Sequence, residues 1–120
     1  MQKIPNSYNI GLWHEKLAKN LLEKKGYKLI KHNYRGCFSQ IDLIMMSNKY
    51  LVFVEVKKTK PGFEIHTLKK FLFKQKKRIF SDLFVFYKTK PEYKHLKPVL
   101  MLIIFAKSKQ PDLYLYYLTP

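Results

Sequence analysis

The chain has 120 residues and is strongly basic, with 24 Lys and Arg against 8 Asp and Glu, a formal net charge of +16 and 47% hydrophobic residues. This length predicts a single domain over residues 1–120 with enough apolar side chains for a core, and the charge predicts a polyanionic partner. No apolar run approaches the roughly 20 residues that span a bilayer, which argues against a membrane protein.

Residues 9–25 are predicted to form the first helix. Apolar side chains recur at helical spacing from Ile10 to Leu22, and Gly26 stands where a C-terminal cap is expected. At about 100° per residue, Glu15 falls roughly 20° from Leu22, on the border of the apolar stripe. A carboxylate there can lean into a cleft between helix and sheet, or it can be a solvated residue favoured by the helix dipole.

Three strands are predicted next, over residues 27–34, 40–46 and 50–58. The second and third are rich in Ile, Leu, Val and Phe, yet they carry Asp42, Glu55 and Lys57. Because burying an unpaired charge is costly, apolar strands should not carry such residues without a reason. That reason is either chemistry or, in the ordinary case, a surface ion pair on a half-exposed hairpin.

The register of the hairpin brings these charges together. Side chains alternate faces along a strand, so Glu55 and Lys57 point the same way. If residues 48–49 are the whole turn, counting back places Asp42 opposite Glu55, and the same count places Gln40 opposite Lys57. Opposed Cβ atoms lie roughly 4.5–5.5 Å apart, a separation that two carboxylates can bridge with one hard cation. A three-residue loop or a bulge would shift the partner of Asp42 by one residue.

A break at Pro61-Gly62 precedes a long basic helix, predicted over residues 66–87. Its buried positions are expected to be Leu68, Phe71, Leu72, Ile79, Leu83 and Phe86. Its aromatic residues are expected in the core rather than as base-stacking platforms. Basic residues gather in and after the third strand, at Lys57, Lys58, Lys60, Lys69, Lys70, Lys74, Lys76, Lys77 and Arg78. A single lysine here is best explained as part of a solvated face, but the cluster predicts a phosphate-binding surface.

The C-terminal part is predicted to contain two more strands. Residues 98–106 form a continuous apolar run, as expected of a central buried strand, and residues 112–118 form the last strand. The predicted order is therefore α-β-β-β-α-β-β. We expect an α/β fold in which a mixed central sheet is flanked by helices.

Five short motifs follow one another along the first half of the chain: Gly11 to Ala18, Gly26 to Ile30, Asn33 to Arg35, Gln40 to Ile44, and Val52 to Lys57. In this order they resemble the YraN family of small bacterial proteins. That family is similar to the archaeal Holliday-junction resolvases and belongs to the PD-(D/E)xK nuclease superfamily. The resemblance implies a PD-(D/E)xK restriction-endonuclease-like core.

The resemblance also implies roles for individual residues. Asp42 and Glu55 would be the metal-binding carboxylates, and the peptide carbonyl of Val56 would complete the metal site. Lys57 would be the catalytic lysine, and Glu15 the accessory acid of the first helix. Taking the basic cluster and the resemblance together, the residues expected to contact DNA are Arg35, Lys58, Lys60, Lys69, Lys70, Lys74, Gln75, Lys76, Lys77 and Arg78.

Three further positions bear on the expected site. Gln75 either faces the active site, as a Gln on this helix does in several nucleases of the superfamily, or is a plain surface residue. Gln40 stands where the family has Glu, which removes one possible acid from the site. His14 stands where the family has a small residue before the helix acid.

These residue types suit phosphodiester hydrolysis. Mg²⁺ or Mn²⁺ would stabilise the developing phosphoryl charge, and Mg²⁺ needs only one or two carboxylates besides water and substrate phosphate. Lys57 would orient or deprotonate the attacking water, or neutralise charge. We therefore expect a metal-dependent DNA endonuclease, and the resemblance implies that it acts on branched or recombination-intermediate DNA. The resemblance to resolvases also implies a homodimer, because two strands must be cut symmetrically.

Two other interpretations remain. The protein could be a catalytically weak or inactive basic DNA- or RNA-binding protein on a nuclease fold, which Gln40 and His14 would suit. Adhesion to anionic membranes would need lysines segregated on an amphipathic surface helix, whereas the second helix also carries core residues. The single Cys37 excludes an intrachain disulfide, and the polar N-terminus does not resemble a secretory signal, so we expect a cytoplasmic protein.

Overall fold

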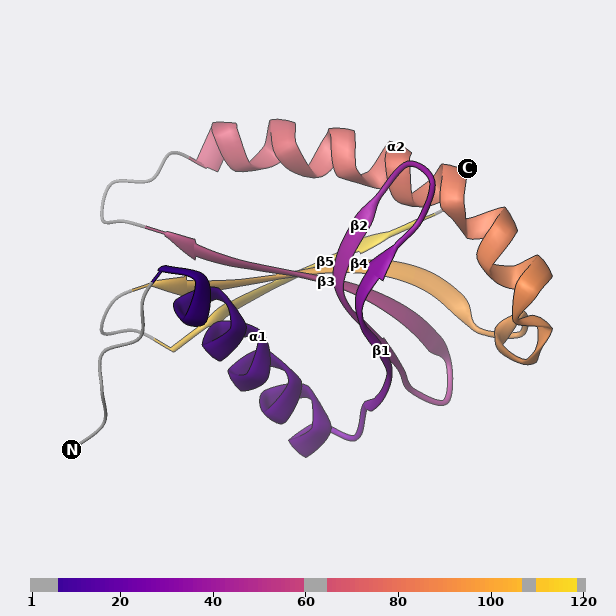
Figure 1. Ribbon diagram of the computed structural model, residues 1–120, viewed down its shortest axis with the longest axis horizontal. Helices are drawn as coiled ribbons and strands as arrows, with labels where there is room; N and C mark the ends of the chain where they lie inside the picture. Colours follow the sequence, from indigo (N-terminus) through magenta and orange to yellow (C-terminus); the bar gives the residue numbers. More distant parts are fainter. Residues whose placement is uncertain (1–6, 60–64, 107–109, 119–120) are drawn as a thin grey trace.

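The computed structural model describes residues 7–59, 65–106 and 110–118 (Figure 1). Its elements are α1 (Ser7–Lys24), β1 (Lys28–Arg35), β2 (Gln40–Met46), β3 (Tyr50–Thr59), α2 (Ile65–Thr89), a short 3-10 helix η1 (Pro91–Tyr93), β4 (Lys97–Ala106) and β5 (Asp112–Tyr117). This order confirms the predicted α/β fold class. The predicted break at residues 61–62 lies outside the described residues.

The five strands form one mixed sheet in the order β1-β2-β3-β4-β5. Strands β3 and β4 are parallel, and the other neighbours are antiparallel. Parallel neighbours need a long crossover connection, which α2 supplies. The two long helices lie on opposite faces of the sheet, α2 above it and α1 below it in Figure 1. Over the described residues, neither helix is long and apolar enough to cross a membrane.

Strand β4 is buried on both faces, as its continuous apolar run predicts. Each residue from Val99 to Ile104 is at most 7% exposed. The strand lies between β3 and β5, so its backbone is paired on both sides. Strands β3 and β4 are therefore interior strands of the sheet, each with a paired neighbour on both sides.

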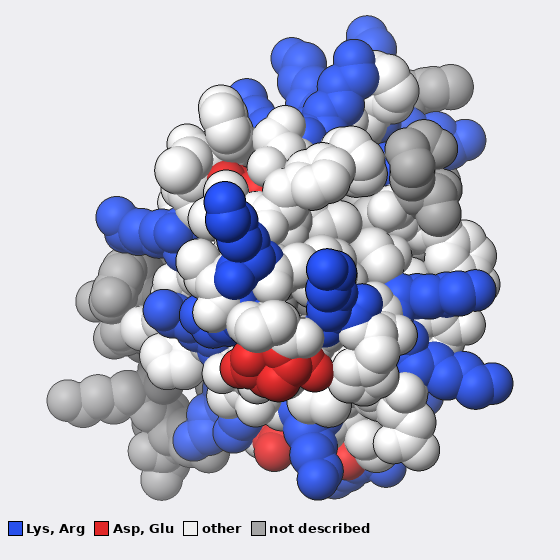
Figure 2. Space-filling view, turned by 90° about the vertical axis from the view of Figure 1, so that its right-hand side faces the viewer, with Lys and Arg blue, Asp and Glu red and all other residues white. Residues whose placement is uncertain are grey.

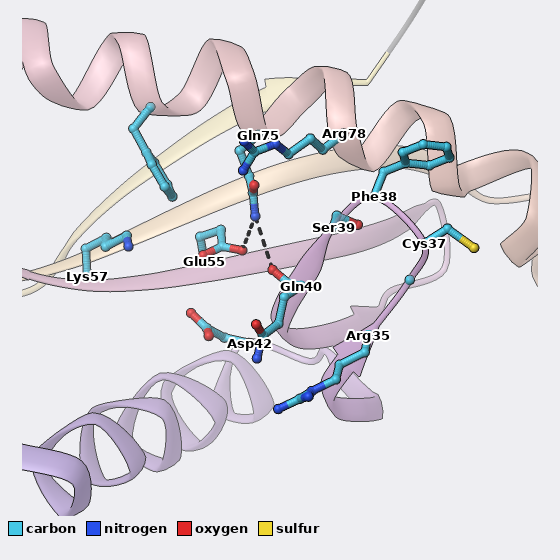
Figure 3. A pocket seen from close by; sticks show the side chains of 12 residues that line it. Arg35, Cys37, Phe38, Ser39, Gln40, Asp42, Glu55, Lys57, Gln75 and Arg78 are labelled. Atoms are coloured by element: carbon cyan, nitrogen blue, oxygen red, sulfur yellow. Dashed lines mark hydrogen bonds between the residues drawn. The ribbon is translucent and has the colours of Figure 1, made fainter.

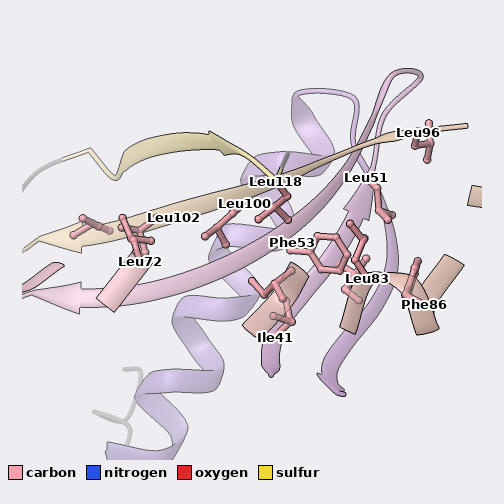
Figure 4. Close-up of a cluster of buried hydrophobic side chains, with 13 residues drawn as sticks. Ile41, Leu51, Phe53, Leu72, Leu83, Phe86, Leu96, Leu100, Leu102 and Leu118 are labelled. Carbon is pink, nitrogen blue, oxygen red and sulfur yellow. The ribbon is translucent and has the colours of Figure 1, made fainter. Parts of the chain in front are cut away.

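Each face of the sheet has its own apolar cluster. Leu72, Ile79, Leu83 and Phe86 of α2 are buried over one face, as predicted, and Phe86 makes an edge-to-face contact with Phe53 (Figure 4). On the other face, Ala18 and Leu22 of α1 pack in a cluster with the valines of β3. Full burial of one such side chain stabilises the fold by roughly 1.5–3 kcal/mol.

Helix α1 ends in the predicted glycine cap. Gly26 has a φ of +98°, in the left-handed region that favours glycine. The N–H of Tyr27 donates to the carbonyl of Leu22, and the N–H of Gly26 donates to that of Glu23, each at 3.0 Å. This pair of bonds is a Schellman motif, which satisfies the last carbonyls of the helix and turns the chain into β1.

The aromatic residues of α2 only partly follow the prediction. Phe86 lies in the core, but Phe73 is 63% exposed and Phe84 is 70% exposed. The expectation that the aromatics of this helix belong to the core is therefore wrong for these two. Phe71, predicted to be buried, is only half-buried. Leu68, predicted beside them, lies outside the residues whose side chains are described.

Candidate functional site

The β2–β3 hairpin has the predicted two-residue turn. The N–H of Ser47 donates to the carbonyl of Tyr50 at 2.9 Å. From there the two strands pair in continuous register as far as Leu43 and Val54. The tight turn and its register are confirmed over this stretch.

Beyond Leu43 and Val54 the ladder stops. Hydrogen-bonded pairs recur at every second residue of an antiparallel ladder, so the next would join Ile41 to Val56. Instead, the N–H of Val56 donates to Oδ2 of Asp42 at 2.7 Å. Asp42 therefore approaches β3 through its side chain and is not a ladder partner of Glu55.

The predicted pairing of Gln40 with Lys57 is wrong for the same reason. The pairing of β2 with β3 ends before that point, and Gln40 pairs with Arg35 on the other side of β2, in β1. The β1–β2 ladder keeps one register from Lys31 to Arg35, and its irregularity lies earlier, between Leu29 and Lys31. Within this stretch Asn33 has a φ of +51°, which Asn tolerates better than most residues.

Three carboxyl groups meet at this point, although the chain has only 8 acids. Burial and the charge of Asp42 raise the pKa of Glu55 to about 8. Burial and the same charge raise the pKa of Glu15, on α1, to about 7. Burial also raises the pKa of Asp42, against the opposing effect of the Val56 N–H. The three acids repel one another in partly desolvated surroundings.

The carboxyl groups of Glu15 and Asp42 act on each other's pKa. Asp42 raises the pKa of Glu15, whereas Glu15 partly offsets the rise in the pKa of Asp42. Neighbouring acids whose pKa values are moved apart in this way do not become charged at the same pH. Glu15 thus reaches the sheet, as one of its two sequence interpretations predicts.

Gln75 of α2 holds Glu55 from the other side of the site. Its Nε2 donates to Oε1 of Glu55 at 2.7 Å and to the carbonyl of Gln40 at 3.1 Å (Figure 3). Gln75 is only 6% exposed and is therefore not a plain surface residue. One side chain connects the diverging ends of β2 and β3 to the helix above them.

Lys57 lies two residues beyond Glu55 on the same strand and enters the same cavity. Its Nζ lies 4.3 Å from the ring centroid of Phe71, over the ring. Its charge opposes the rise in pKa of both Asp42 and Glu55. Glu55 and Lys57 therefore share one face of β3, as predicted, and Asp42 lines the same cavity.

These side chains surround a cavity of about 600 Å³ (Figure 3). It is lined by Arg35, Gly36, Cys37, Phe38, Ser39, Gln40, Asp42, Glu55, Lys57, Phe71, Gln75 and Arg78. Arg35 approaches from β1 and Arg78 from α2, and both are exposed (Figure 3). The cavity thus joins buried acids to guanidinium groups that water can reach.

Sequence reasoning missed Asp82, which holds in place the turn at residues 36–39 that lines this cavity. The carboxylate of Asp82, on α2, accepts hydrogen bonds from the backbone N–H groups of Cys37, Phe38 and Ser39 at 2.7–3.2 Å. It also accepts a hydrogen bond from the hydroxyl of Ser39 at 2.6 Å. A Cβ at Gly36 would collide with this carboxylate, so the turn needs glycine there. An acid on the apolar stripe of a helix was the signal that could have revealed it.

The residues predicted to contact DNA do not all lie together. Arg35, Gln75 and Arg78 line the cavity, whereas Lys58 is exposed outside it. The lysines of α2 are exposed except for Lys76, which is half-buried. Lys60 lies outside the described residues. Figure 2 shows one face of the molecule, on which Lys and Arg side chains project all around and acidic atoms form only small patches.

The oxygen donors of the cavity suit a small divalent metal ion. In the described part of the chain, no group of three or more His, Cys, Asp or Glu is arranged to hold a metal. Mg²⁺ needs only one or two carboxylates, because water and substrate phosphate complete its shell. Asp42 and Glu55 are hard oxygen donors with raised pKa values, so a cation beside them would relieve their repulsion. Their donor atoms are therefore of the kind that Mg²⁺ and Mn²⁺ prefer.

Comparison with known proteins places these residues in a family. The model of the "Uncharacterised protein family UPF0102" matches residues 14–97, a range that contains Glu15, Asp42, Glu55 and Lys57. A UPF0102 protein of Acinetobacter baylyi is 30% identical over 113 residues, covering 89% of this chain and 81% of the relative.

Two further relatives have the same family name. A UPF0102 protein of Ehrlichia chaffeensis is 38% identical over 105 residues, covering 85% of this chain and 81% of the relative. A UPF0102 protein of Syntrophomonas wolfei is 44% identical over 48 residues, covering 40% of this chain and 42% of the relative. Because the family model spans most of the sheet as well as the site, this chain belongs to the UPF0102 family, the YraN family whose motifs its sequence resembles.

Proposed function

We propose that this protein is a metal-dependent endonuclease that hydrolyses phosphodiester bonds in DNA. The observation that carries the proposal is the convergence of Asp42, Glu55, Lys57 and Gln75 in one cavity with two arginines at its edge. Acids with raised pKa beside a lysine are typical of catalytic sites rather than of surface ion pairs. The net charge of +16 favours a polyanionic substrate.

Asp42 and Glu55 would hold Mg²⁺ or Mn²⁺. Within a strand, the N–H and the carbonyl of one residue point to the same side. The Val56 N–H points to Asp42, so the carbonyl of Val56 points into the same gap and is a third candidate ligand. When bound, the metal would supply Lewis-acid stabilisation of charge on the phosphoryl oxygens.

The chain's own groups would bind and orient the substrate. Arg35 and Arg78 would hold phosphates on either side of the scissile bond, as guanidinium groups do through paired hydrogen bonds. Gln75 fixes the carboxylate of Glu55. As an ammonium group, Lys57 would orient the attacking water or neutralise the charge that develops, and it would accept the water's proton only after losing one of its own. Water adds to phosphorus and gives up a proton to solvent or to the neutral lysine, the bond to the leaving oxygen breaks, and that oxygen takes up a proton from solvent.

Branched DNA and a two-fold dimer are the finer parts of the proposal. They are supported by the family resemblance and by the need to cut two strands symmetrically. They are tested together by comparing linear, flapped and four-way-junction DNA as substrates, with sedimentation measured on the same preparation. A preference for the junction and a dimeric mass are the expected results.

The central experiment uses isosteric variants. Purified protein is incubated with each DNA in Mg²⁺ or Mn²⁺, beside Asp42→Asn, Glu55→Gln and Lys57→Met. Cleavage should require the metal and fall by at least about 100-fold in each variant. Matched controls are Asp112→Asn and Lys49→Met, which change exposed residues outside the cavity. Full cleavage by all three site variants would refute this assignment.

A second candidate is a nucleic-acid-binding protein without turnover. It is favoured by Gln40, which supplies a neutral side chain to the cavity where the family pattern has an acid. Binding of DNA with no cleavage in either metal, by a folded protein, would support it. In that case Gln40→Glu is the variant with which to seek restored cleavage.

A further inference from the structure

Three aromatic side chains form a stripe on the outer flank of α2. Phe73, Phe80 and Phe84 follow one another at helical spacing, with Lys77 among them, and the four positions fall within about 60° of one another. Phe73 and Phe84 are more than half exposed, and Phe80 is half-buried. Single exposed apolar residues are ordinary, but a line of aromatic rings in water indicates a binding surface.

The stripe borders a groove that is separate from the acidic cavity. One hollow of about 460 Å³ is lined by Phe73, Lys76, Lys77, Phe80 and Ser81. A second hollow of about 230 Å³ adjoins it, since Phe73 and Lys76 line both, and it extends to Tyr116 of β5. The larger volume lies in the range of small-ligand sites, roughly 300–1,000 Å³. Its walls combine aromatic rings with ammonium groups.

The side chains of the stripe contact one another, which restricts their conformations. The Nζ of Lys77 lies 4.6 Å from the ring centroid of Phe73. Phe80 and Phe84 make an edge-to-face contact with their centroids 5.7 Å apart. A surface whose rings are already held loses less side-chain entropy when a ligand binds.

The charges favour one class of occupant. Among the residues that the structure describes, those that line the two hollows include no acid. The acid of α2 whose side chain is described, Asp82, is buried against the β1–β2 turn. A second copy of this chain would bring its own net charge of +16 to the same lysines, whereas a nucleic acid brings phosphates. Aromatic rings interleaved with lysines suit a single strand, because only unpaired bases offer free faces for stacking.

We propose that this groove and the aromatic stripe beside it bind unpaired bases of single-stranded DNA. Phe73, in the groove, and Phe84, farther along the stripe, each provide a stacking surface for a different base, and Lys76 and Lys77 bind the flanking phosphates. This site goes beyond the cleavage proposed above, and its occupation requires neither the metal nor turnover.

The groove and the acidic cavity lie on different flanks of one helix. Gln75 and Arg78 face the cavity, Phe73 faces the groove, and the exposed Lys70 and Lys74 lie between them at about 100° per residue. An α-helix with its side chains is only about 10–12 Å across. Since α2 is the outer layer on its face of the sheet (Figure 1), a strand that leaves the cavity can cross the helix to the groove within a few nucleotides.

The test measures binding without cleavage. Fluorescence anisotropy is recorded in EDTA with a labelled oligothymidylate about 20 nucleotides long and, separately, with a duplex of the same length. Phe73→Leu and Phe84→Leu keep an apolar side chain but remove the stacking ring. Each should weaken binding of the single strand by about fivefold or more and leave duplex binding nearly unchanged. Phe73→Trp should retain or strengthen it.

Controls separate stacking from charge and from folding. Tyr117→Leu removes an exposed ring on β5 outside the groove and should bind as the parent protein does. Lys77→Ala should weaken both single-strand and duplex binding. Circular dichroism confirms the fold of each variant. The Asp42→Asn variant should retain single-strand binding, so a failure of the nuclease proposal would not affect the result.

Two outcomes would overturn the inference. The first is single-strand binding by Phe73→Leu and Phe84→Leu that equals that of the parent protein. The second is a parent dimer that becomes monomeric in Phe73→Leu without any selective loss of single-strand binding, which would make the groove an interface between copies of this chain.

Discussion

Gln75 and Glu55 are joined by a buried hydrogen bond, in which Nε2 of Gln75 donates to Oε1 of Glu55 at 2.7 Å. The same nitrogen donates to the carbonyl of Gln40. A carboxylate in a desolvated site needs donors, and this neutral amide supplies one without neutralising the acid. Glu55 is thereby held in place, while the bond only partly offsets the rise in its pKa.

Replacement of Gln75 by Met should affect both stability and cleavage. Met has nearly the same size but cannot donate, so it leaves the buried Oε1 of Glu55 and the partly buried carbonyl of Gln40 without this partner. We expect a loss of about 1–3 kcal/mol in the free energy of unfolding, measured by urea denaturation. Metal-dependent cleavage should fall together with it, because Glu55 is no longer oriented.

The exposed Gln110 provides a matched control, since Gln110→Met makes the same chemical change in water. It should leave stability within about 0.5 kcal/mol of the parent protein. A Gln75→Met variant with unchanged stability and unchanged cleavage would contradict the positioning role of this amide.

Replacement of Asp82 by Asn should destabilise the β1–β2 turn, whose backbone N–H groups donate to the Asp82 carboxylate. Asp82→Asn keeps the shape of the side chain but turns one acceptor oxygen into an NH₂ group that faces backbone donors. Since hydrogen bonds to a charged acceptor are strong and their loss leaves buried N–H groups unsatisfied, we expect a cost of about 3 kcal/mol. Urea denaturation gives the stability, and hydrogen exchange of residues 37–39 should become faster.

Asp112→Asn is the control for this change, because Asp112 is exposed on β5. Equal stability of Asp82→Asn and the parent protein, with unchanged exchange at the turn, would show that the turn holds its shape without the carboxylate.

Much of the fold follows from local patterns in the chain. The apolar run of β4, the alternation in β3 and the glycine after α1 each act on neighbouring residues, so they predict the elements without knowledge of their packing. The two-residue turn likewise sets the register as far as Leu43 and Val54. Beyond that pair, prediction failed, because Asp42 exchanges a backbone partner for a side-chain contact.

The rest depends on contacts between distant residues. Asp82 meets a turn that lies more than 40 residues earlier in the chain, and only the rotation of α2 about its axis decides that Asp82 faces inward and Phe73 outward. Periodicity placed Phe86 correctly because it lies at the centre of the apolar stripe. It could not decide whether an aromatic residue on the flank of the helix was core or surface.

The raised pKa values predict how the metal-free protein responds to pH. Glu15 and Glu55 have an ordinary pKa of 4.5, and in the folded protein it rises to about 7 and about 8. At a pH between the ordinary pKa and the raised pKa of each acid, the folded protein binds more protons than the unfolded chain. Its free energy of unfolding should therefore fall as pH rises from about 4.5 to about 8. Thermal denaturation in EDTA measures the trend.

The variant Glu55→Gln isolates this effect, because its side chain cannot titrate. The midpoint of thermal denaturation should fall less steeply with pH in Glu55→Gln than in the parent protein. Mg²⁺ should stabilise the parent protein most at the upper end of the range, where the acids are charged. A parent protein whose stability rises across this range would show that the acids do not repel one another as described.

The contact between Lys57 and Phe71 gives a final prediction. An ammonium group over an aromatic ring gains roughly 0.5–2 kcal/mol, and here the ring also keeps Lys57 on the side of the acids. Phe71→Leu should therefore lower the rate of metal-dependent cleavage by about threefold or more, whereas Phe71→Tyr should keep the ring and the rate. Both rates are measured at saturating DNA, so that a change in binding does not enter. Equal cleavage by Phe71→Leu and the parent protein would mean that the carboxylates alone orient Lys57.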